Sequence, residues 1–551
     1  GGMLLAGIAL RHYGLDLVDE GTLLAQTERL RTGQWLYRDF HTGYGPASFA
    51  LNAALLNTFG VRVEVVRVGL AVVHAVTLAV LAVLAGRALG RLAAVVVLAL
   101  TASFFLPIAP GAFCVWNIPY PSWYAQAAGG LGLLAALATA RRGGVALLAS
   151  GAWWGLAFCC KQNAGVLGMA AVLVWRAFER SERRATVGGR ALAVPLAALL
   201  GAGALVVVAG GSLGATGSVA VALPVLALAA RVATLRPATA LVADAVWLAA
   251  GFALVVVPVV LGLVWVIGWA PLARQLLHLG SGAAAVYGVA YPGPSEVVGA
   301  LAGVADGLRG IRKAMDLAWL FLLPAGNLVA ALALRPGART ATWRLAVPTA
   351  VLAYVQLYPR ADFWHLLPVA GMSLVVALGV TLQALGQARA ARAVAIALLA
   401  LAAVRALPNV AVARAALSSP PPGAPVIARA GVRWDLAASP ALRAVPEVMA
   451  AVAGAPGLVG FPALGIFNFL AGIPSPLRHD YFFPGLLDVA EQETIGREIA
   501  RVPGTRVVLL RDDVAFFEES FASHPALTAA LEREFPVVRR VGPYEVREAA
   551  R

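Results

Sequence analysis

The sequence predicts a mainly α-helical, polytopic membrane protein with a small α/β domain at its C-terminal end. Of its 551 residues, 60% are hydrophobic and 13% are charged, and the mean hydropathy is +0.81. A soluble chain needs roughly 25% charged residues to cover its surface. Because this chain carries about half of that share, we expect lipid to be the solvent of most of it.

Apolar segments of about 17–25 residues, long enough to cross the hydrocarbon core of a bilayer, recur along the first three quarters of the chain. We count about 13 crossings, several of them short or interrupted by Gly and Pro. The first segment is too short to span, so we expect the first helix to begin upstream of the given sequence. The segments are 1–11, 66–86, 91–108, 122–140, 144–159, 163–178, 191–211, 213–230, 241–268, 316–334, 344–358, 366–386 and 392–407.

The basic residues predict the orientation. They cluster in alternate connections, which the positive-inside rule assigns to the cytoplasm. The net charge of +15 is therefore attributed to membrane orientation, and no nucleic-acid partner is expected. Nearly all basic residues are Arg, which suggests a GC-rich bacterial source and a multi-pass protein of the inner (plasma) membrane. The exoplasmic (periplasmic) segments are then 12–65, 109–121, the turn at Lys161, 269–315, 359–365 and the tail after 408.

The composition changes after residue 407. We predict a transmembrane domain over 1–407, with a long exoplasmic loop at 12–65, a linker over 408–425 and a soluble exoplasmic α/β domain over 426–551. The linker contains the run Ser-Ser-Pro-Pro-Pro-Gly, which is typical of loops. In the tail, strand-like runs at 457–461, 506–510 and 536–541 alternate with helical runs at 491–501 and 524–534, which indicates an α/β fold.

Asp19 and Glu20 open the first exoplasmic loop, and charged residues near membrane depth are functional candidates. A carboxylate there can take the proton of an acceptor hydroxyl. Alternatively, both residues begin an amphipathic helix that lies along the membrane interface, because acidic residues favour the N-terminal helix dipole. The residues alone leave both interpretations open. Asp39 and Tyr44 follow in the same loop, in the runs 37–41 and 43–46.

Lys161, Gln162 and Asn163 form a polar turn between two apolar segments. A lysine at this place can hold a phosphate as a compact point charge. The alternative is a lysine that snorkels to the interface from a helix end. The two neighbouring amides, on so short an exoplasmic turn, favour a polar site.

Arg360, Asp362 and His365 lie in the short exoplasmic connection 358–365. Arg can clamp a phosphate with its fork of N–H groups, and His can donate to another phosphate oxygen or to a leaving group. The alternative is an Arg360–Asp362 ion pair flanked by aromatic interface anchors. A turn alone does not require so many polar residues, which favours function.

Arg478 and Asp480 belong to the aromatic-rich run 478–485 of the tail. In a soluble domain such runs more often pack than bind. A binding role is therefore the less favoured interpretation of these two residues.

Taken in order, these motifs resemble the C-type superfamily of membrane glycosyltransferases, and among them bacterial proteins similar to protein O-mannosyltransferases and the lipid A aminoarabinose transferase. Each motif is weak by itself, but the ordered set covers the whole chain. The resemblance implies a bundle of many membrane helices and a sugar donor linked to a lipid phosphate. It also implies transfer to a hydroxyl of a glycan, lipid or protein acceptor on the exoplasmic face.

The resemblance further implies roles for the candidate residues. Asp19, with Glu20 beside it, matches the catalytic base, and Lys161, Arg360 and His365 match the groups that bind the donor phosphate. Some relatives hold a divalent cation, but no loop here has a dense carboxylate cluster, so a tight metal site is not predicted. The residues that would position substrates are Asp39, Tyr44, Gln162, Asn163, Asp362, Arg478 and Asp480.

Three other functions compete with transfer of a polyprenyl-phosphate-linked sugar. A flippase or transporter of lipid-linked sugars should show inverted repeats and ionisable residues at the midplane. We find no clear repeat, and Asp244 is the only acid well inside an apolar segment. A polysaccharide polymerase or ligase usually has one large late exoplasmic loop, whereas here the large polar features are the first loop and the tail. An inactive scaffold is the third alternative.

Overall fold

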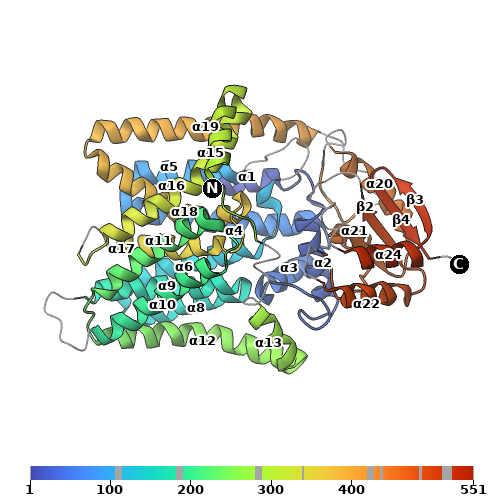
Figure 1. The fold of residues 1–551 in the computed structure, drawn as a ribbon, viewed down its shortest axis with the longest axis horizontal. Helices are drawn as coiled ribbons and strands as arrows, with labels where there is room; N and C mark the ends of the chain where they lie inside the picture. The colour runs from blue at the N-terminus through green and yellow to red at the C-terminus, as the bar shows by residue number, and fades with distance from the viewer. Residues whose placement is uncertain are drawn as a thin grey trace.

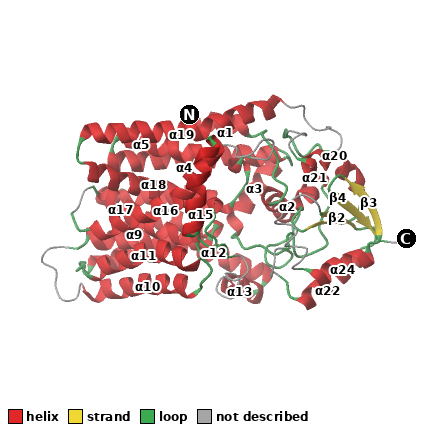
Figure 2. Cartoon of the chain, turned by 45° about the horizontal axis from the view of Figure 1, so that its top comes forward, coloured by secondary structure: helices red, strands yellow, loops and turns green. Residues whose placement is uncertain are grey.

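A computed structural model describes residues 2–105, 114–181, 190–278, 288–337, 340–418, 427–434, 439–482, 487–511 and 524–549 of the chain. Helices dominate, as predicted, and Figures 1 and 2 show most of the apolar ones lying side by side at one end of the molecule. Four strands lie at the opposite end. The chain therefore has an apolar helical bundle and a smaller mixed α/β region.

The bundle is built from long apolar helices. In the described part of the chain, five segments have the length and hydropathy needed to cross a membrane: Val63–Leu89, Gly214–Ala233, Ala240–Ile267, Lys313–Ala333 and Phe363–Leu385. This confirms the predicted membrane protein, whereas the count of about 13 crossings stays a prediction. The helices of the bundle are α1 (Gly2–Leu10), α4 (Val63–Leu89), α5 (Arg91–Phe105), α6 (Pro121–Leu137), α8 (Gly144–Cys160), α9 (Gln162–Glu179), α10 (Arg190–Ala209), α11 (Gly214–Ala233), α12 (Ala240–Ile267), α16 (Leu308–Ala333), α17 (Ala341–Tyr354), α18 (Phe363–Leu385) and α19 (Ala388–Ser418).

Two local predictions need correction. The predicted linker begins at residue 408, but α19 continues as a helix to Ser418, because the good helix formers on both sides of Pro408 outweigh the one hydrogen bond that proline removes. The predicted interfacial helix is α2 (Asp19–Arg31), and most of its residues are buried. It packs against α3 (Pro46–Phe59) and α21 (Gly465–Ala471), so protein rather than the membrane surface surrounds it.

The tail contains a four-stranded sheet in the order β1-β2-β4-β3, with β1 parallel to β2 and the other neighbours antiparallel. The predicted strands and helices are present, and sequence analysis missed only β4 among the strands described. The elements are β1 (Leu458–Phe461), β2 (Arg506–Leu510), β3 (Val537–Val541) and β4 (Tyr544–Glu548), with helices α20 (Pro440–Val452), α21, α22 (Val489–Ala500) and α24 (Pro525–Glu534).

Both faces of this sheet are covered. Phe461 and Leu509 share one apolar cluster with residues of α22 and α24, including Ile499 and Leu531. On the other face, Val508 joins the large core that continues through α20 and α21 into the helical bundle. The sheet is therefore packed as part of the molecule and is not a separate appendage.

The first loop and the tail are joined by close packing and by ion pairs. Gly21 of α2 leaves no room for a side chain, since a Cβ there would lie 2.6 Å from the Cβ of Ile466 in α21. Arg29 donates to Asp480 across 2.7 Å, and both side chains are almost fully buried. In Figure 1, α2 and α3 accordingly lie between the bundle and the sheet.

Candidate functional site

Asp19 lies at the first position of α2 and is only partly buried. The Asp16 carboxylate accepts hydrogen bonds from the backbone N–H groups of Asp19 (2.6 Å) and Glu20 (3.0 Å). This satisfies two of the unpaired donors at the helix start. Asp19 therefore begins a helix, as one interpretation predicted, and its own side chain stays available for other contacts.

Tyr120 is the closest side-chain partner of Asp19. It lies just before α6, and its hydroxyl donates a hydrogen bond to Asp19 Oδ2. No other described residue hydrogen-bonds to the Asp19 side chain, so Oδ1 is available for a substrate. Sequence analysis missed Tyr120, although a tyrosine between Pro119 and Pro121 in a predicted exoplasmic connection was a usable signal.

The pKa of Asp19 reflects the groups around it. Burial raises this pKa, whereas the Tyr120 hydrogen bond and the nearby charges of His365 and Arg360 lower it, and burial dominates. A carboxylate with a raised pKa is a stronger base while it is ionised. The same interactions show that the loop before α18 approaches Asp19.

The loop before α18 is ordered by its own side chains. Asp362 is the N-cap of α18 and accepts from the backbone N–H (2.9 Å) and the Nδ1 (2.7 Å) of His365. Arg360 Nε donates to the second oxygen of Asp362 across 3.1 Å. Burial raises the pKa of Asp362, but these interactions with His365 and Arg360 outweigh it and keep the pKa below its usual value. The predicted Arg360–Asp362 ion pair thus exists beside Asp19.

A segment of the predicted exoplasmic loop 269–315 holds Arg360 from the other side. Val289 N–H donates to the Pro359 carbonyl and the Val289 carbonyl accepts from the N–H of Ala361, each across 3.1 Å. This pair of bonds is a short parallel bridge centred on Arg360. The backbone of Arg360 is therefore fixed by a segment more than sixty residues away in the sequence.

Lys161 is the N-cap residue of α9, on the short turn after α8. Its ammonium donates to the Ser122 hydroxyl across 3.1 Å, two residues beyond Tyr120. Burial lowers the pKa of Lys161 to about 8, and no described carboxylate pairs with it. A partly buried ammonium without a carboxylate partner is suited to an anionic ligand.

The first loop returns to this turn near Tyr44. Gly45 N–H donates to the Cys160 carbonyl across 3.1 Å, and a Cβ at Gly45 would lie 2.1 Å from the Cys159 carbonyl oxygen. Only glycine permits this approach. Ionisation of Tyr44 would raise the pKa of Tyr120, so the motif at 43–46 lies within electrostatic reach of the Asp19 site.

The remaining candidates lie elsewhere or have other partners. Both oxygens of Glu20 accept from Arg67, each across 2.7 Å. Asp39 pairs with Arg38 (2.8 Å) at the surface. Gln162 and Asn163 start α9, and their side chains form no hydrogen bond within the described residues. Arg478 donates to the Tyr37 carbonyl (2.6 Å) and Asp480 accepts from Arg29; both lie toward the C-terminal end of α2.

An apolar cavity of about 100 Å³ lies in the bundle and is lined in part by Ser122, the partner of Lys161. Ser122 and Gln126 of α6 are among its polar lining residues, and Gly129, Gly130 and Gly168 make room among larger apolar side chains. Pro368 and Met372 of α18 complete the wall. The cavity therefore touches the helices that carry Ser122 and His365.

Two further observations bear on competing functions. Asp244, the acid inside α12, forms ion pairs with Arg176 (2.9 Å) and Arg180 (2.8 Å) at the end of α9. Its carboxylate is therefore engaged with two arginines of the protein. Within the described residues, no group of three or more His, Cys, Asp or Glu side chains is arranged to hold a metal ion.

The chain was compared with known proteins. No family model and no curated protein sequence matches it, but 11 chains of solved structures are similar. The oligosaccharyltransferase AglB from Archaeoglobus fulgidus, solved with an inhibitory peptide and a dolichol-phosphate, is 14% identical with a TM-score of 0.46, over 99% of this chain and 74% of that one. ArnT from Cupriavidus metallidurans, bound to undecaprenyl phosphate, is 13% identical with a TM-score of 0.37, over 99% and 96%. At these TM-scores the likeness carries no functional argument.

Proposed function

We propose that this protein is a membrane glycosyltransferase that moves a sugar from a polyprenyl-phosphate-linked donor to an acceptor hydroxyl. Asp19 is the base, and Lys161, Arg360 and His365 bind the donor phosphate. The reaction takes place on the exoplasmic (periplasmic) face of a bacterial inner membrane.

One observation supports this proposal: Asp19 interacts with basic side chains of a distant loop and, through Tyr120, with the segment that contacts Lys161. Arg360 and His365 act on the charge of Asp19, and Tyr120 links Asp19 to the segment that binds Lys161. Positive charge beside a base is the combination that displacement of a phosphate requires, because the leaving group departs easily only when its charge is neutralised.

The chemistry follows from these positions. Asp19 Oδ1 takes the proton of the acceptor hydroxyl while the acceptor oxygen bonds to the anomeric carbon of the sugar. The bond between that carbon and the phosphate oxygen breaks, and the electron pair leaves with the lipid phosphate. Lys161 and Arg360 stabilise the new charge. The proton ends on Asp19, which solvent then deprotonates.

The apolar cavity supports a lipid-linked donor. Ser122, which Lys161 contacts, lines it, and most of the other lining residues are apolar. A phosphate held at Lys161 would thus place the start of an isoprenoid chain in the bundle. The volume suits only a short stretch of that chain, so the remainder would lie in the bilayer.

The proposal is tested with purified protein in lipid nanodiscs and a polyprenyl-phosphate-linked sugar. Asp19→Asn should abolish transfer while undecaprenyl phosphate still binds, and Lys161→Ala and Arg360→Ala should each weaken that binding by roughly tenfold or more. Glu532→Gln, an acid-to-amide change at an exposed ion pair with Arg511, is the matched control and should leave both unchanged.

Two outcomes would reject the proposal. Unchanged transfer in Asp19→Asn would show that Asp19 is not the base. Unchanged undecaprenyl phosphate affinity in both Lys161→Ala and Arg360→Ala would show that these residues do not bind the phosphate. Movement of an intact lipid-linked sugar across proteoliposomes, without transfer, would instead favour the flippase.

A further inference from the structure

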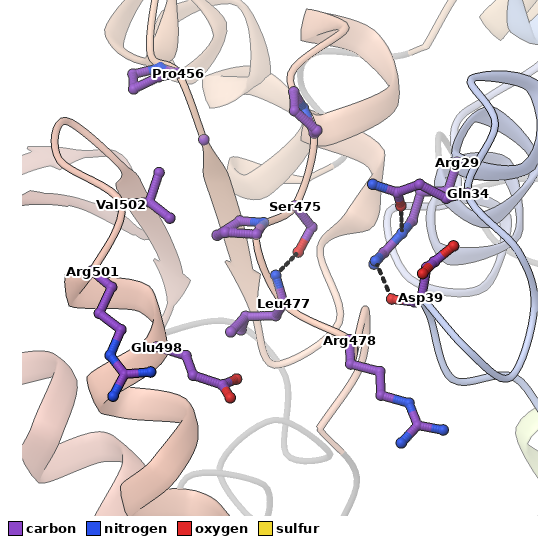
Figure 3. A pocket seen from close by; sticks show the side chains of 13 residues that line it. Arg29, Gln34, Asp39, Pro456, Ser475, Leu477, Arg478, Glu498, Arg501 and Val502 are labelled. Carbon is purple, nitrogen blue, oxygen red and sulfur yellow. Dashed lines mark hydrogen bonds between the residues drawn. The ribbon is translucent and has the colours of Figure 1, made fainter. Parts of the chain in front are cut away.

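A large polar cleft lies at the opposite end of α2 from Asp19. Its volume is about 760 Å³, within the range of about 300–1,000 Å³ that is usual for ligand sites. Figure 3 shows Arg29, Gln34 and Asp39 on one side and Glu498, Arg501 and Val502 on the other, with Ser475–Arg478 between them. The first loop and the tail thus each supply one wall.

Two segments of the chain run from the cleft to the candidate active site. Arg29 is ten residues beyond Asp19 on α2, and a helix rises 1.5 Å per residue, so the two residues lie about 15 Å apart along the axis. The loop that contains Gln34 and Asp39 continues to Tyr44 beside Tyr120, and Tyr37 ties it together by donating to the Tyr44 carbonyl across 2.6 Å. A ligand that contacts both places must therefore span about 15 Å.

The lining favours a ligand with many polar groups over a peptide strand. Pro456, Pro474 and Pro476 line the cleft and have no N–H to donate. The backbone beside them is already used, since Leu458 N–H donates to the Pro474 carbonyl and Arg506 N–H donates to the Gly457 carbonyl. A peptide that adds a strand needs a row of unpaired backbone groups, whereas this cleft recognises its ligand with side chains.

The charges favour an acidic ligand. Three arginines and two carboxylates line the cleft, and Asp39 and Arg29 are paired with Arg38 and Asp480. Arg501, at the end of α22, is exposed and has no ion-pair partner among the described residues. A guanidinium in this position can bind a carboxylate through two parallel hydrogen bonds.

We propose that this cleft binds an acidic glycan, a chain of several sugar units that carry carboxylate groups, as the acceptor whose end is glycosylated at Asp19. This inference rests on the proposed function and names its acceptor class. Arg501 and Arg478 bind the acid groups, and Glu498 accepts hydrogen bonds from sugar hydroxyls. The distance of about 15 Å requires an acceptor longer than one sugar.

The test measures binding to the full chain in nanodiscs by fluorescence anisotropy. The probes are labelled tetragalacturonate, the neutral glycan maltotetraose and the acidic peptide hexaglutamate. Tetragalacturonate should bind best, Arg501→Glu should weaken it by roughly tenfold or more, and Glu498→Gln should strengthen it. Arg497→Glu is the matched control, since Arg497 is exposed on the same helix outside the cleft, and it should change the affinity less than twofold.

Equal affinity in wild type and Arg501→Glu, or preferential binding of hexaglutamate or maltotetraose, would overturn this inference. Undecaprenyl phosphate binding is measured in the same preparations, because it tests the proposed function separately. If the lipid binds at Lys161 and tetragalacturonate does not bind, only the acceptor class fails. If tetragalacturonate binds at Arg501 but Asp19→Asn retains transfer, the proposed function fails and the glycan site stands.

Discussion

Arg67 of α4 holds both carboxylate oxygens of Glu20 at 2.7 Å, one residue after the candidate base Asp19. The same guanidinium donates to the carbonyl groups of Arg11, Tyr13 and Gly14, and its side chain is fully buried. Arg67 thus fixes the chain that leads into α2. Through Glu20 it sets the position of Asp19 without touching a substrate.

Replacement of Arg67 by Lys should therefore disturb both stability and catalysis. A lysine keeps the charge but cannot form the fork, so some of the buried acceptors lose their donor, at about 1–3 kcal/mol for each group left unsatisfied. We expect a lower midpoint in chemical denaturation and a lower kcat, with undecaprenyl phosphate affinity retained because Lys161 and Arg360 are unchanged. Glu20→Gln leaves the buried Arg67 charge without its counter-ion, so it should also lower the denaturation midpoint. A kcat loss equal to that of Asp19→Asn with an unchanged midpoint would show that Glu20 itself is the base.

Tyr120→Phe should shift the pH dependence of transfer. The Tyr120 hydrogen bond lowers the pKa of Asp19, so its removal raises that pKa. Because the base must be ionised, the acidic limb of the kcat/KM profile should move to higher pH, and the rate above that limb should fall by roughly tenfold at most. A profile that keeps its midpoint would show that Tyr120 does not act on the base.

Donor affinity should decrease above pH 8. Burial lowers the pKa of Lys161 to about 8, so the side chain is a charged ammonium below this pH and a neutral amine above it. Binding of an anion requires the charged form, and affinity should therefore fall by up to about tenfold per pH unit above the pKa. In Lys161→Arg, which stays charged, undecaprenyl phosphate affinity should be flat from pH 7 to 9.5. A matching decrease in both proteins would assign the effect to another group.

The junction between the first loop and the tail should be sensitive to acid. Burial lowers the pKa of His479 to about 3, helped by the charges of His41, Arg478 and Arg29, and the His479 and His41 rings lie 5.5 Å apart. Between this pKa and about 6.5, the usual value in an unfolded chain, the unfolded state binds a proton that the folded state does not. Stability is therefore present above pH 6.5 and is lost as the pH falls.

In His479→Gln the midpoint of thermal unfolding should depend less on pH than in wild type, when both are measured from pH 7.5 to 5. Glutamine keeps a polar group of similar size and does not titrate. Equal slopes in the two proteins would assign the acid sensitivity elsewhere.

Several features of the site could be predicted because they are local. The start of α2 at Asp19 follows from acidic residues at a helix N-terminus. The contacts among Arg360, Asp362 and His365 join residues at most five positions apart. Strand β4 was missed because it is short and three of its five residues are charged. The ion pair between Arg547 and Glu545, at 2.7 Å, offsets part of this charge once the sheet has formed.

The sequence by itself determined that the chain is a helical membrane protein and which polar residues lie between its apolar segments. Hydropathy decides this, because each helix must satisfy its own backbone in lipid. Only the tertiary structure decided that Glu20 forms an ion pair with Arg67, and that Tyr120 and Lys161 form hydrogen bonds with Asp19 and Ser122, respectively. Lipid is as apolar as the helices it surrounds, so hydropathy does not select which helices become neighbours. Close packing at small residues makes that choice: a Cβ at Gly151 of α8 or at Gly251 of α12 would collide with the backbone of the other helix. Gly21 and Gly45 do the same for the first loop, and with it the site around Asp19.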